Sequence, residues 1–210
     1  NSLELLKNYE NLIKIKISGD INAAIARNVG ADISKGSVLF FIDGDMEIMP
    51  DFLNKIYTEQ TGLVNDFVSG KYINYYYSKD WELLSKEKYN YSDEVIENVT
   101  GGLFLIKKEV WNEIGGMRNF FKYSEDIDLG LRLSKINIQL HRKGDLAAIH
   151  HTIQYFDKNR MWLDFFKLNN FYGRSLIYRS HLTNCKMYYR LVRNDYTAIF
   201  LLILLMITFL

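Results

Sequence analysis

The sequence predicts an α/β fold in which helices cover both faces of a sheet. Segments of helical periodicity alternate along the chain with short apolar runs, and these runs are continuous, as expected for strands buried on both faces. The 210 residues are enough for one domain with a substantial core. Because ligands of such sheets bind beyond the carboxyl ends of the strands, polar residues that follow a strand are the first candidates for a functional site.

The first three elements are predicted from periodicity. The alternation of Ile and Lys at 13–17 indicates a strand. Apolar side chains at four-residue spacing, from Ile21 to Ile33, predict a helix that packs on that face and leaves Arg27 off it. The five apolar residues at 38–42 predict a fully buried strand.

Proline and glycine delimit the elements in the middle of the chain. A proline suits the first turn of a helix, and glycine commonly ends one. The predicted elements are a helix from Pro50 to Tyr57, a strand at 67–77, a short polar helix or loop at 80–88, a strand at 101–106, and a helix at 108–114 that ends at Gly115 and Gly116.

The remaining elements follow from a capping serine and from apolar spacing. Ser124 predicts the start of a helix that extends to about residue 135, with its leucines facing inward. Residues 136–140 and 146–149 are typical of short strands, and residues 159–178 form an aromatic-rich helical stretch.

The composition excludes several classes of protein. A net charge of +1 gives no electrostatic support to nucleic-acid binding, so we expect no nucleic-acid partner. The single cysteine, Cys185, excludes an internal disulfide framework and is compatible with a reducing compartment. With one proline in the whole chain, a long flexible linker is not expected.

The carboxyl-terminal part of the chain points to a membrane. Residues 196–210 are uncharged and mostly apolar and are predicted to begin a transmembrane helix, with a buried core helix as the alternative. Residues 156–195 are rich in aromatic and basic side chains and are predicted to be a helical interface segment. Basic residues beside the apolar run predict that the domain lies on the cytoplasmic side; they are Lys186, Arg190 and Arg193.

The strongest candidate site is Asp43-Gly44-Asp45, which directly follows the predicted strand at 38–42. Alternation along a strand would point Asp43 and Asp45 the same way, and Gly44 would let a ligand approach the backbone. Two carboxylates at such an edge suit a hard divalent cation that is shared with substrate phosphates. An acidic turn without a ligand is the alternative, because Asp and Gly are common turn residues.

A second acidic cluster, Glu125, Asp126 and Asp128, opens the helix that Ser124 is predicted to cap. Acidic residues in a first turn stabilise a helix through its dipole, which is a structural reason for their presence. Three carboxylates in four positions exceed that need, and a carboxylate held there near a bound sugar could deprotonate an acceptor hydroxyl.

Three further features add candidates. The imidazole of His150 could complete the coordination of an ion bound by Asp45, or could be a hydrogen-bonded structural group. Arg27, followed by Asn28, could meet a diphosphate or a base edge, or could be a solvated helix charge. The aromatic side chains at 160–166 have helical spacing, which favours an amphipathic helix on the core or membrane surface over an acceptor contact.

The order of these motifs resembles the family 2 glycosyltransferases, whose nucleotide-sugar-binding fold is called GT-A. The resemblance covers about residues 1–155 and implies a Rossmann-like mixed sheet with helices on both faces. It rests on Ala26-Arg27-Asn28-x-Gly30, Asp43-Gly44-Asp45, Thr100-Gly101-Gly102-x-Phe104, Val110-Trp-Asn-Glu-Ile-Gly-Gly-Met117 and Glu125-Asp126-x-Asp128-Leu129-x-x-Arg132.

The resemblance implies how a nucleotide-sugar donor would be held. Asp45 would bind a Mg²⁺ or Mn²⁺ ion directly, and Asp43 would contact the ion or the ribose. His150 would be a further metal ligand, although His151 could take that place instead. Such an ion would neutralise charge on the departing nucleoside diphosphate.

The resemblance also implies an inverting transfer to a glycan or lipid-linked acceptor. Asp126 would be the base that takes the proton from the acceptor hydroxyl, with Glu125 as its neighbour and fallback. The remaining substrate contacts that it implies are Arg27 and Asn28 near the nucleotide and Gly101 and Gly102 in the sugar pocket.

The chain departs from the family pattern in three respects. The strands that normally open the nucleotide site are not recognisable, which predicts a fragment with an incomplete site and an exposed sheet edge. Met161 separates Arg160 from Trp162, which counts against a processive polysaccharide synthase. Glu47 follows the Asp-Gly-Asp motif and could compete for the ion.

Two other functions stay open from the residues alone. A nucleotidyltransferase that forms sugar-nucleotides would use a similar α/β sheet, with a Gly-rich basic loop near its start. A non-catalytic, membrane-associated binding module is the second alternative, although the carboxylates at 43, 45, 125 and 126 argue against loss of catalytic function.

Overall fold

The structure is a computed structural model that describes residues 4, 6, 9–97, 99–154, 170–185, 187–189, 203 and 206–208. Its elements in chain order are α2 (Ala23–Ile33), β1 (Val38–Ile42), β2 (Met46–Ile48), α3 (Pro50–Ile56), β3 (Tyr57–Thr58), β4 (Gly62–Leu63), β5 (Phe67–Tyr77), β6 (Leu83–Lys86), β7 (Val95–Glu97), β8 (Leu103–Lys107), α4 (Lys108–Ile114), α5 (Glu125–Lys135), β9 (Leu140–Ile153) and α7 (Asn170–Ser180).

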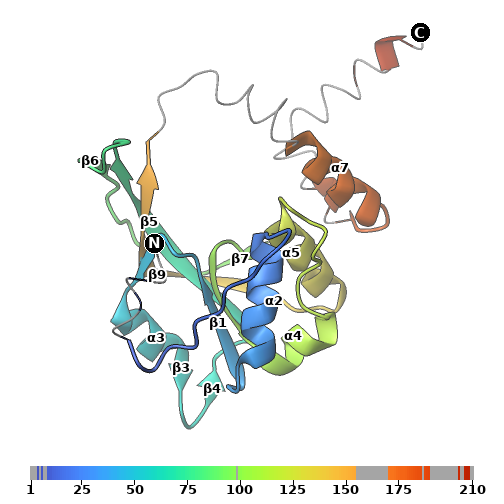
Figure 1. Ribbon diagram of the computed structural model, residues 1–210. Coiled ribbons are helices and arrows are strands. Elements are labelled where there is room, and N and C mark those ends of the chain that lie inside the picture. The colour runs from blue at the N-terminus through green and yellow to red at the C-terminus, as the bar shows by residue number, and fades with distance from the viewer. Residues whose placement is uncertain are drawn as a thin grey trace.

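A mixed sheet runs through the molecule in the order β1-β8-β5-β9-β2, with β6 paired to β5 and β7 paired to β9. The pair β5–β9 is parallel and the other pairs are antiparallel. Helix α3 packs on one face of the sheet, and α2, α4 and α5 pack on the other (Figure 1). The predicted α/β fold with helices on both faces is therefore confirmed.

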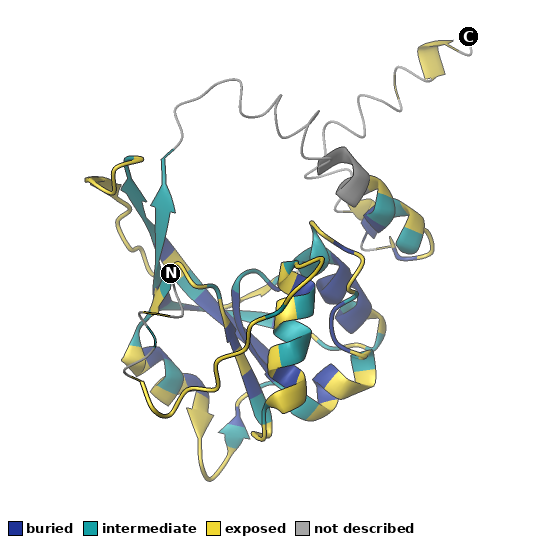
Figure 2. Ribbon diagram, viewed as in Figure 1, coloured by how far each residue is buried: buried dark blue, intermediate teal, exposed yellow. Residues whose placement is uncertain are grey.

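Alternating side chains of β8 contribute to two cores. Phe104 and Ile106 join the cluster under α2, α4 and α5, whereas Leu103 and Leu105 join the cluster under α3. The buried residues follow the strands and the inner face of α5 (Figure 2). This packing brings the carboxyl end of β1 close to the residues that precede β8, where the candidate site lies.

Helix α2 packs through alanines, so its inward face differs from the predicted one. Ala24 and Ala31 are buried, whereas Ile21 and Ile33 are 57% and 42% exposed. Arg27 shares the alanine face, because residues three and four apart lie one above the other on a helix. The prediction that Arg27 lies off the packed face was wrong: the small alanines let the helix approach the sheet on that side.

Strand β1 is buried on one face only, which corrects the prediction for 38–42. Leu39 and Phe41 are buried in the cluster that includes α2, but Phe40 and Ile42 are 37% and 38% exposed. Within the described residues, β1 pairs with β8 alone and forms an edge of the sheet. The exposed sheet edge that the sequence predicts is thus present in the described part of the chain.

The strand predicted at 13–17 does not form. These residues carry no strand assignment, and Ile13 and Ile15 are 75% and 42% exposed. Alternation of apolar and polar side chains describes a strand only where a neighbouring strand supplies backbone partners. The prediction was wrong because no described segment pairs with these residues.

Two other strand predictions need correction. The separate strands expected at 136–140 and 146–149 are replaced by the long strand β9, which pairs in parallel with β5 from Val68 to Tyr77. The polar segment predicted as a helix or loop at 80–88 contains β6, which pairs with the end of β5. In both cases β5 supplies the backbone partners that local composition does not reveal.

The last described elements pack against α5. Ile177 and Met187 form a cluster with Phe121 and Leu131, which seats α7 and the turn after it on the domain. Most of 156–195, including Arg160 and Trp162, and most of 196–210 lie outside the described residues. No helix among the described residues is long and apolar enough to cross a membrane.

Candidate functional site

The Asp43-Gly44-Asp45 motif lies in a turn at the end of β1. The N–H of Met46 donates to the carbonyl oxygen of Asp43 at 3.1 Å, which closes the turn. The strand alternation that would point both carboxylates the same way is therefore absent. Asp43 contacts Arg27, and Asp45 contacts His150.

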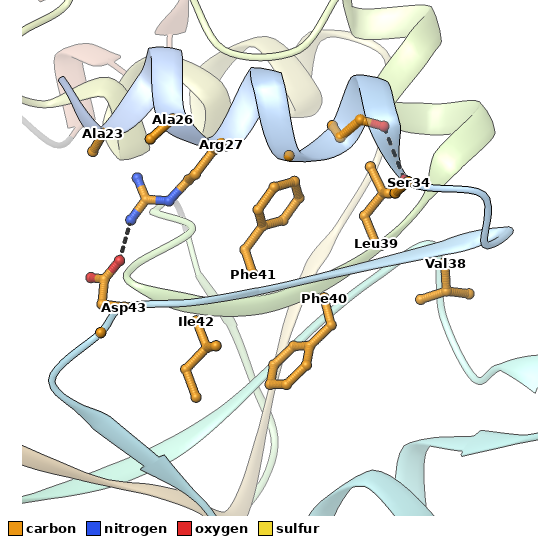
Figure 3. A pocket seen from close by; sticks show the side chains of 13 residues that line it. Ala23, Ala26, Arg27, Ser34, Val38, Leu39, Phe40, Phe41, Ile42 and Asp43 are labelled. Atoms are coloured by element: carbon orange, nitrogen blue, oxygen red, sulfur yellow. Dashed lines mark hydrogen bonds and ion pairs between the residues drawn. The ribbon is translucent and has the colours of Figure 1, made fainter. Parts of the chain in front are cut away.

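Arg27 connects the two acidic clusters. Its Nη2 lies 2.6 Å from Oδ1 of Asp43, and its Nη1 lies 3.0 Å from Oε1 of Glu125. The Arg27 side chain is only 11% exposed, and Figure 3 shows it reaching from α2 to the end of β1. A guanidinium between two carboxylates reduces their mutual repulsion and fixes their separation. The solvated-charge interpretation of Arg27 is excluded.

Gly102 makes room for the Asp43 carboxylate. The Asp43 N–H donates to the Gly102 carbonyl at 3.0 Å, and a Cβ at Gly102 would lie 2.1 Å from Oδ2 of Asp43. The neighbouring Gly101 has a φ of +70°, a conformation that favours glycine. A place for Gly101 and Gly102 in a sugar pocket stays a prediction.

Asn28 on α2 forms hydrogen bonds with the loop after α4. Its Oδ1 accepts from the N–H of Met117 at 2.9 Å, and its Nδ2 donates to the Met117 carbonyl at 2.7 Å. A third bond, also 2.7 Å long, runs from Nδ2 to Oδ1 of Asn119. Asn28 thus positions the loop that contacts Arg27 through Met117; its contact with the nucleotide stays a prediction.

His150 meets Asp45 because β2 and β9 are antiparallel neighbours. The pairing sets Met46 opposite His150, and the His151 N–H donates to the Asp45 carbonyl at 2.8 Å. As a result, Nε2 of His150 lies 3.2 Å from Oδ2 of Asp45. The Asp45 side chain is 52% exposed, so this pair is open to solvent on its outer side.

His151 forms a similar pair with a different carboxylate. Its Nε2 lies 3.3 Å from Oε2 of Glu47, and its Nδ1 lies 2.9 Å from the hydroxyl of Tyr77. Both histidines therefore meet a carboxylate, but only His150 meets a carboxylate of the Asp-Gly-Asp motif.

Asn74 in β5 supports His150 from the side opposite Asp45. Its Oδ1 lies 2.7 Å from Nδ1 of His150, and its Nδ2 donates to Oε2 of Glu87 at 3.0 Å. Glu87 also accepts from the Asn74 N–H at 2.9 Å and from the Tyr76 hydroxyl at 2.8 Å. The bonds from Asn74 and then that from Tyr76 lower the pKa of Glu87, which keeps it an ionised acceptor.

The first turn of α5 carries the predicted catalytic carboxylates. Glu125 is 15% exposed and tied to Arg27, as described above. Asp126 accepts through Oδ1 from the Ile127 N–H at 2.9 Å, and its carbonyl accepts from Thr100 N–H at 3.4 Å. Thr100 precedes the glycine pair, so the start of α5 is fixed beside Gly101.

Asp128 has a structural position, distinct from that of the other two carboxylates. It is fully buried and lies 2.8 Å from Arg132 Nε, 2.8 Å from His181 Nε2 and 3.2 Å from Arg118 Nη1. Burial raises the pKa of Asp128, but the bond from His181 and the charges of Arg132 and Arg118 outweigh it, so the net pKa is lowered. The three carboxylates of the second cluster thus have three different environments.

A groove of about 440 Å³ lies between α2 and β1 and ends at the Arg27–Asp43 pair (Figure 3). Its walls are small or apolar over most of their length, with Ala26 and Gly30 on the helix side and Leu39 and Phe41 on the strand side. The polar end of the groove therefore opens onto the candidate site.

Two residues at the site could hold a divalent cation. Within the described residues, no group of three or more His, Cys, Asp or Glu side chains converges. Asp45 and His150 do converge, and their 3.2 Å separation is near the roughly 3.0 Å between neighbouring ligands of an octahedral ion with bonds of about 2.1 Å. An ion held by two protein ligands would keep positions for phosphate oxygens.

The amino-terminal sequence supplies the decisive observation. Residues 1–126 match the family described as Glycosyl transferase family 2, which is more than half of the chain. The chain belongs to glycosyltransferase family 2. The family resemblance that the motif order indicates is thereby confirmed. The matched region ends at Asp126, which directly follows Glu125.

Two curated relatives are also glycosyltransferases. An "Uncharacterized glycosyltransferase" of Haemophilus influenzae is 30% identical over 118 residues, which cover 53% of this chain and 40% of the relative. Rhamnosyltransferase WbbL of Escherichia coli is 34% identical over 77 residues, 34% of this chain and 29% of the relative. The chain spans well under half the length of both.

A solved structure, GalNAc-T7 with UDP, GalNAc and Mn²⁺, aligns with 66% of this chain and 32% of its own. The identity is 12% and the TM-score is 0.49.

Several residues around the site were not predicted from the sequence. Asn74 and Glu87 support His150, and His181 meets Asp128. Thr100 belongs to a predicted motif, but its bond to Asp126 was not predicted. Asn74 gives one recognisable signal, because it is a single amide in the aromatic strand segment Tyr-Ile-Asn-Tyr-Tyr-Tyr and Asn is depleted in strands. Glu87 gives none, since it lies in a polar segment.

Proposed function

We propose that this family 2 glycosyltransferase transfers a sugar from a UDP- or GDP-linked donor to a hydroxyl of a glycan or lipid-linked acceptor. The transfer is metal-dependent, inverts the anomeric configuration and takes place on a GT-A-type sheet. The observation that carries the proposal is the bridge from Arg27 to both Asp43 and Glu125, because it joins the two acidic clusters in one site.

Asp45 and His150 are the proposed protein ligands of a Mg²⁺ or Mn²⁺ ion. When bound, such an ion neutralises the charge that develops on the departing nucleoside diphosphate. Arg27 holds Asp43 at the end of β1. Asp43 is the proposed contact of the ribose or the ion. Gly101 and Gly102 are the proposed lining of the sugar pocket, and Arg27 and Asn28 are the proposed contacts near the nucleotide.

Asp126 is the proposed base. The Glu125 carboxylate forms an ion pair with Arg27. Asp126 is the next residue in the first turn of α5, and its carboxylate accepts a hydrogen bond from the Ile127 N–H. Asp126 accepts the proton of the acceptor hydroxyl as the hydroxyl oxygen attacks the anomeric carbon on the face opposite the leaving group. The amino-terminal end of α5 stabilises a negative charge at this position.

We also propose that a membrane is a partner, with the domain on its cytoplasmic side. The support is in the sequence: basic and tyrosine side chains precede the apolar run at 196–210. A lipid-linked or surface-glycan acceptor is consistent with that position.

The donor and metal assignments predict how the protein responds to ligands. We expect at least one UDP- or GDP-sugar to raise the thermal unfolding temperature, and only with Mn²⁺ or Mg²⁺ present, because binding to the folded state stabilises it. Asp45→Ala should weaken this metal-dependent stabilisation by the donor. If no donor of the panel stabilises the protein with either ion, the proposed function is wrong.

Asp126→Asn separates binding from chemistry in the same assay. It should lower turnover by a factor of about 10² to 10⁴ while donor-dependent stabilisation remains, because only the proton acceptor is lost. Glu125→Gln is the matched variant and should act mainly through the loss of the ion pair with Arg27. Turnover by Asp126→Asn at the rate of the unchanged protein would remove Asp126 as the base.

A further inference from the structure

The environment of His150 decides which of its two nitrogens carries a proton. We infer that Asn74, held by Glu87, is a positioning residue that fixes the proton on Nδ1 of His150 and so leaves the Nε2 lone pair directed at Asp45. The inference rests on the proposed metal site and adds two residues to it.

The orientation of the Asn74 amide follows from Glu87. An ionised carboxylate only accepts hydrogen bonds, and Oε2 of Glu87 lies 3.0 Å from the terminal side-chain nitrogen of Asn74 and 2.9 Å from its backbone nitrogen. The NH₂ group of Asn74 must therefore face Glu87. Its Oδ1 must face His150, which is how amide orientation is assigned from a hydrogen-bond network.

The amide oxygen of Asn74 determines the tautomer of His150. Both Oδ1 of Asn74 and the Asp45 carboxylate can only accept, but Oδ1 lies 2.7 Å from Nδ1 whereas Asp45 lies 3.2 Å from Nε2, so the shorter contact places the hydrogen on Nδ1. In a neutral imidazole the other nitrogen, Nε2, then has the lone pair. This is the arrangement of a metal-ligating histidine whose second nitrogen is bound to a polar partner.

The contact between Nε2 and Asp45 supports a cation. Nε2 and Oδ2 lie 3.2 Å apart, and both are acceptors when the ring is neutral. Two facing acceptors repel each other unless a cation lies between them, and either a proton or a divalent ion can serve. The bonds of Asn74 to Nδ1 and to Glu87 do not involve that cation, so they would be kept with either one.

His151 lacks this preorganisation. Its Nδ1 lies 2.9 Å from the Tyr77 hydroxyl, which can either donate or accept and therefore does not select a tautomer. Its Nε2 meets Glu47 at 3.3 Å. Of the two adjacent histidines, the geometry points to His150 as the ligand.

The tautomer can be measured without any transferase assay. We would record the imidazole ¹⁵N resonances of the full 210-residue chain, free of metal and at alkaline pH, where histidine is neutral. His150 should show protonated Nδ1 and unprotonated Nε2. In Asn74→Leu, which is similar in size but cannot bond, the proton should move mainly to Nε2. An unchanged tautomer in Asn74→Leu would overturn the inference.

Mn²⁺ affinity in the presence of UDP provides the second measurement. By electron paramagnetic resonance, Asn74→Leu should bind Mn²⁺ about 10- to 100-fold more weakly, the usual effect of losing a partner of a ligating histidine. Glu87→Ala, which frees the amide to turn, should have a smaller effect. Tyr77→Phe is the matched control beside His151 and should change neither reading.

The two measurements distinguish the possible failures. If the unchanged protein does not bind Mn²⁺ with UDP, the proposed metal site is wrong, and the His150 resonances still decide whether Asn74 selects the tautomer. If the tautomer changes but Mn²⁺ affinity does not, Asn74 has no positioning role toward the metal. A thermal unfolding curve of each variant checks that the tautomer and the Mn²⁺ affinity are measured on folded protein.

Discussion

The Arg27 guanidinium organises the site at the scale of single residues. One side chain contacts the carboxylate that ends β1 and the carboxylate that starts α5, and it is almost buried while doing so. From the sequence, Arg27 was expected to contact a diphosphate or a base edge, or to be a solvated charge on the helix. Only the packing of the alanine face of α2 determines that its partners are Asp43 and Glu125.

Gly102 and Gly44, the two glycines near Asp43, should differ in how far substitution by alanine destabilises the protein. Gly102→Ala should lower the free energy of unfolding by about 1–3 kcal/mol, because its Cβ would lie 2.1 Å from Oδ2 of Asp43 and displace the carboxylate from Arg27. Urea unfolding measures the change.

Gly44→Ala is the matched control within the Asp-Gly-Asp motif. A Cβ at Gly44 meets nothing within 4 Å, and Gly44 does not have a positive φ, so its free energy of unfolding should change by less than about 1 kcal/mol. Equal destabilisation by the two substitutions would show that the space beside Asp43 is not what makes Gly102 necessary.

At the scale of elements, the sequence predicted the helices more closely than the strands. Apolar runs and helix-end signals place α3, α4, α5, β5 and β8 close to their observed bounds. The wrong predictions at 13–17, 80–88 and 136–149 share one cause, since a strand forms there only if a neighbouring strand is present. The local composition of a segment does not show whether such a neighbouring strand is present.

The contact between α5 and the turn after α7 depends on one buried carboxylate. Asp128 accepts from His181 and from two arginines, and Asp128→Asn would leave Arg132 buried without its anion. We expect a loss of about 3 kcal/mol in the free energy of unfolding near neutral pH. His181→Gln, which keeps a donor, should lose less.

The pH dependence of this contribution has a defined sign. Because the folded pKa of Asp128 is lowered, the stabilisation is fully present above the ordinary pKa of about 3.8 and is lost as the pH falls through the folded value. Urea unfolding at decreasing pH should therefore show a steeper loss of stability below about pH 4 for the unchanged protein than for Asp128→Asn. Parallel pH profiles for the two proteins would contradict the assignment.

At the scale of the whole molecule, different observations support the domain and the predicted membrane segment at 196–210. The domain is defined by its sheet and by the family match over residues 1–126. The membrane proposal comes from composition alone, because most of 186–210 lies outside the described residues.

Vesicle binding tests the membrane proposal. We expect the full chain to bind vesicles that contain anionic phosphatidylserine, and replacing Lys186, Arg190 and Arg193 with Gln should weaken binding by up to about 100-fold, since each basic residue contributes about 1 kcal/mol. Replacing Lys14, Lys16 and Lys35 removes the same charge at distant positions and is the control. A chain that stays in the supernatant with every vesicle would refute the proposal.

The sequence by itself determined the fold class, the family and most of the residues that meet at the candidate site. Short, ordered motifs carry that information because each encodes a local requirement, such as a carboxylate after a strand or an acidic first turn of a helix. The tertiary structure alone decided the partners: Arg27 for Asp43 and Glu125, Asn74 for His150, and His181 for Asp128. Such contacts join residues that are 16 to 98 positions apart, and only the packing of the sheet and its helices sets their distances.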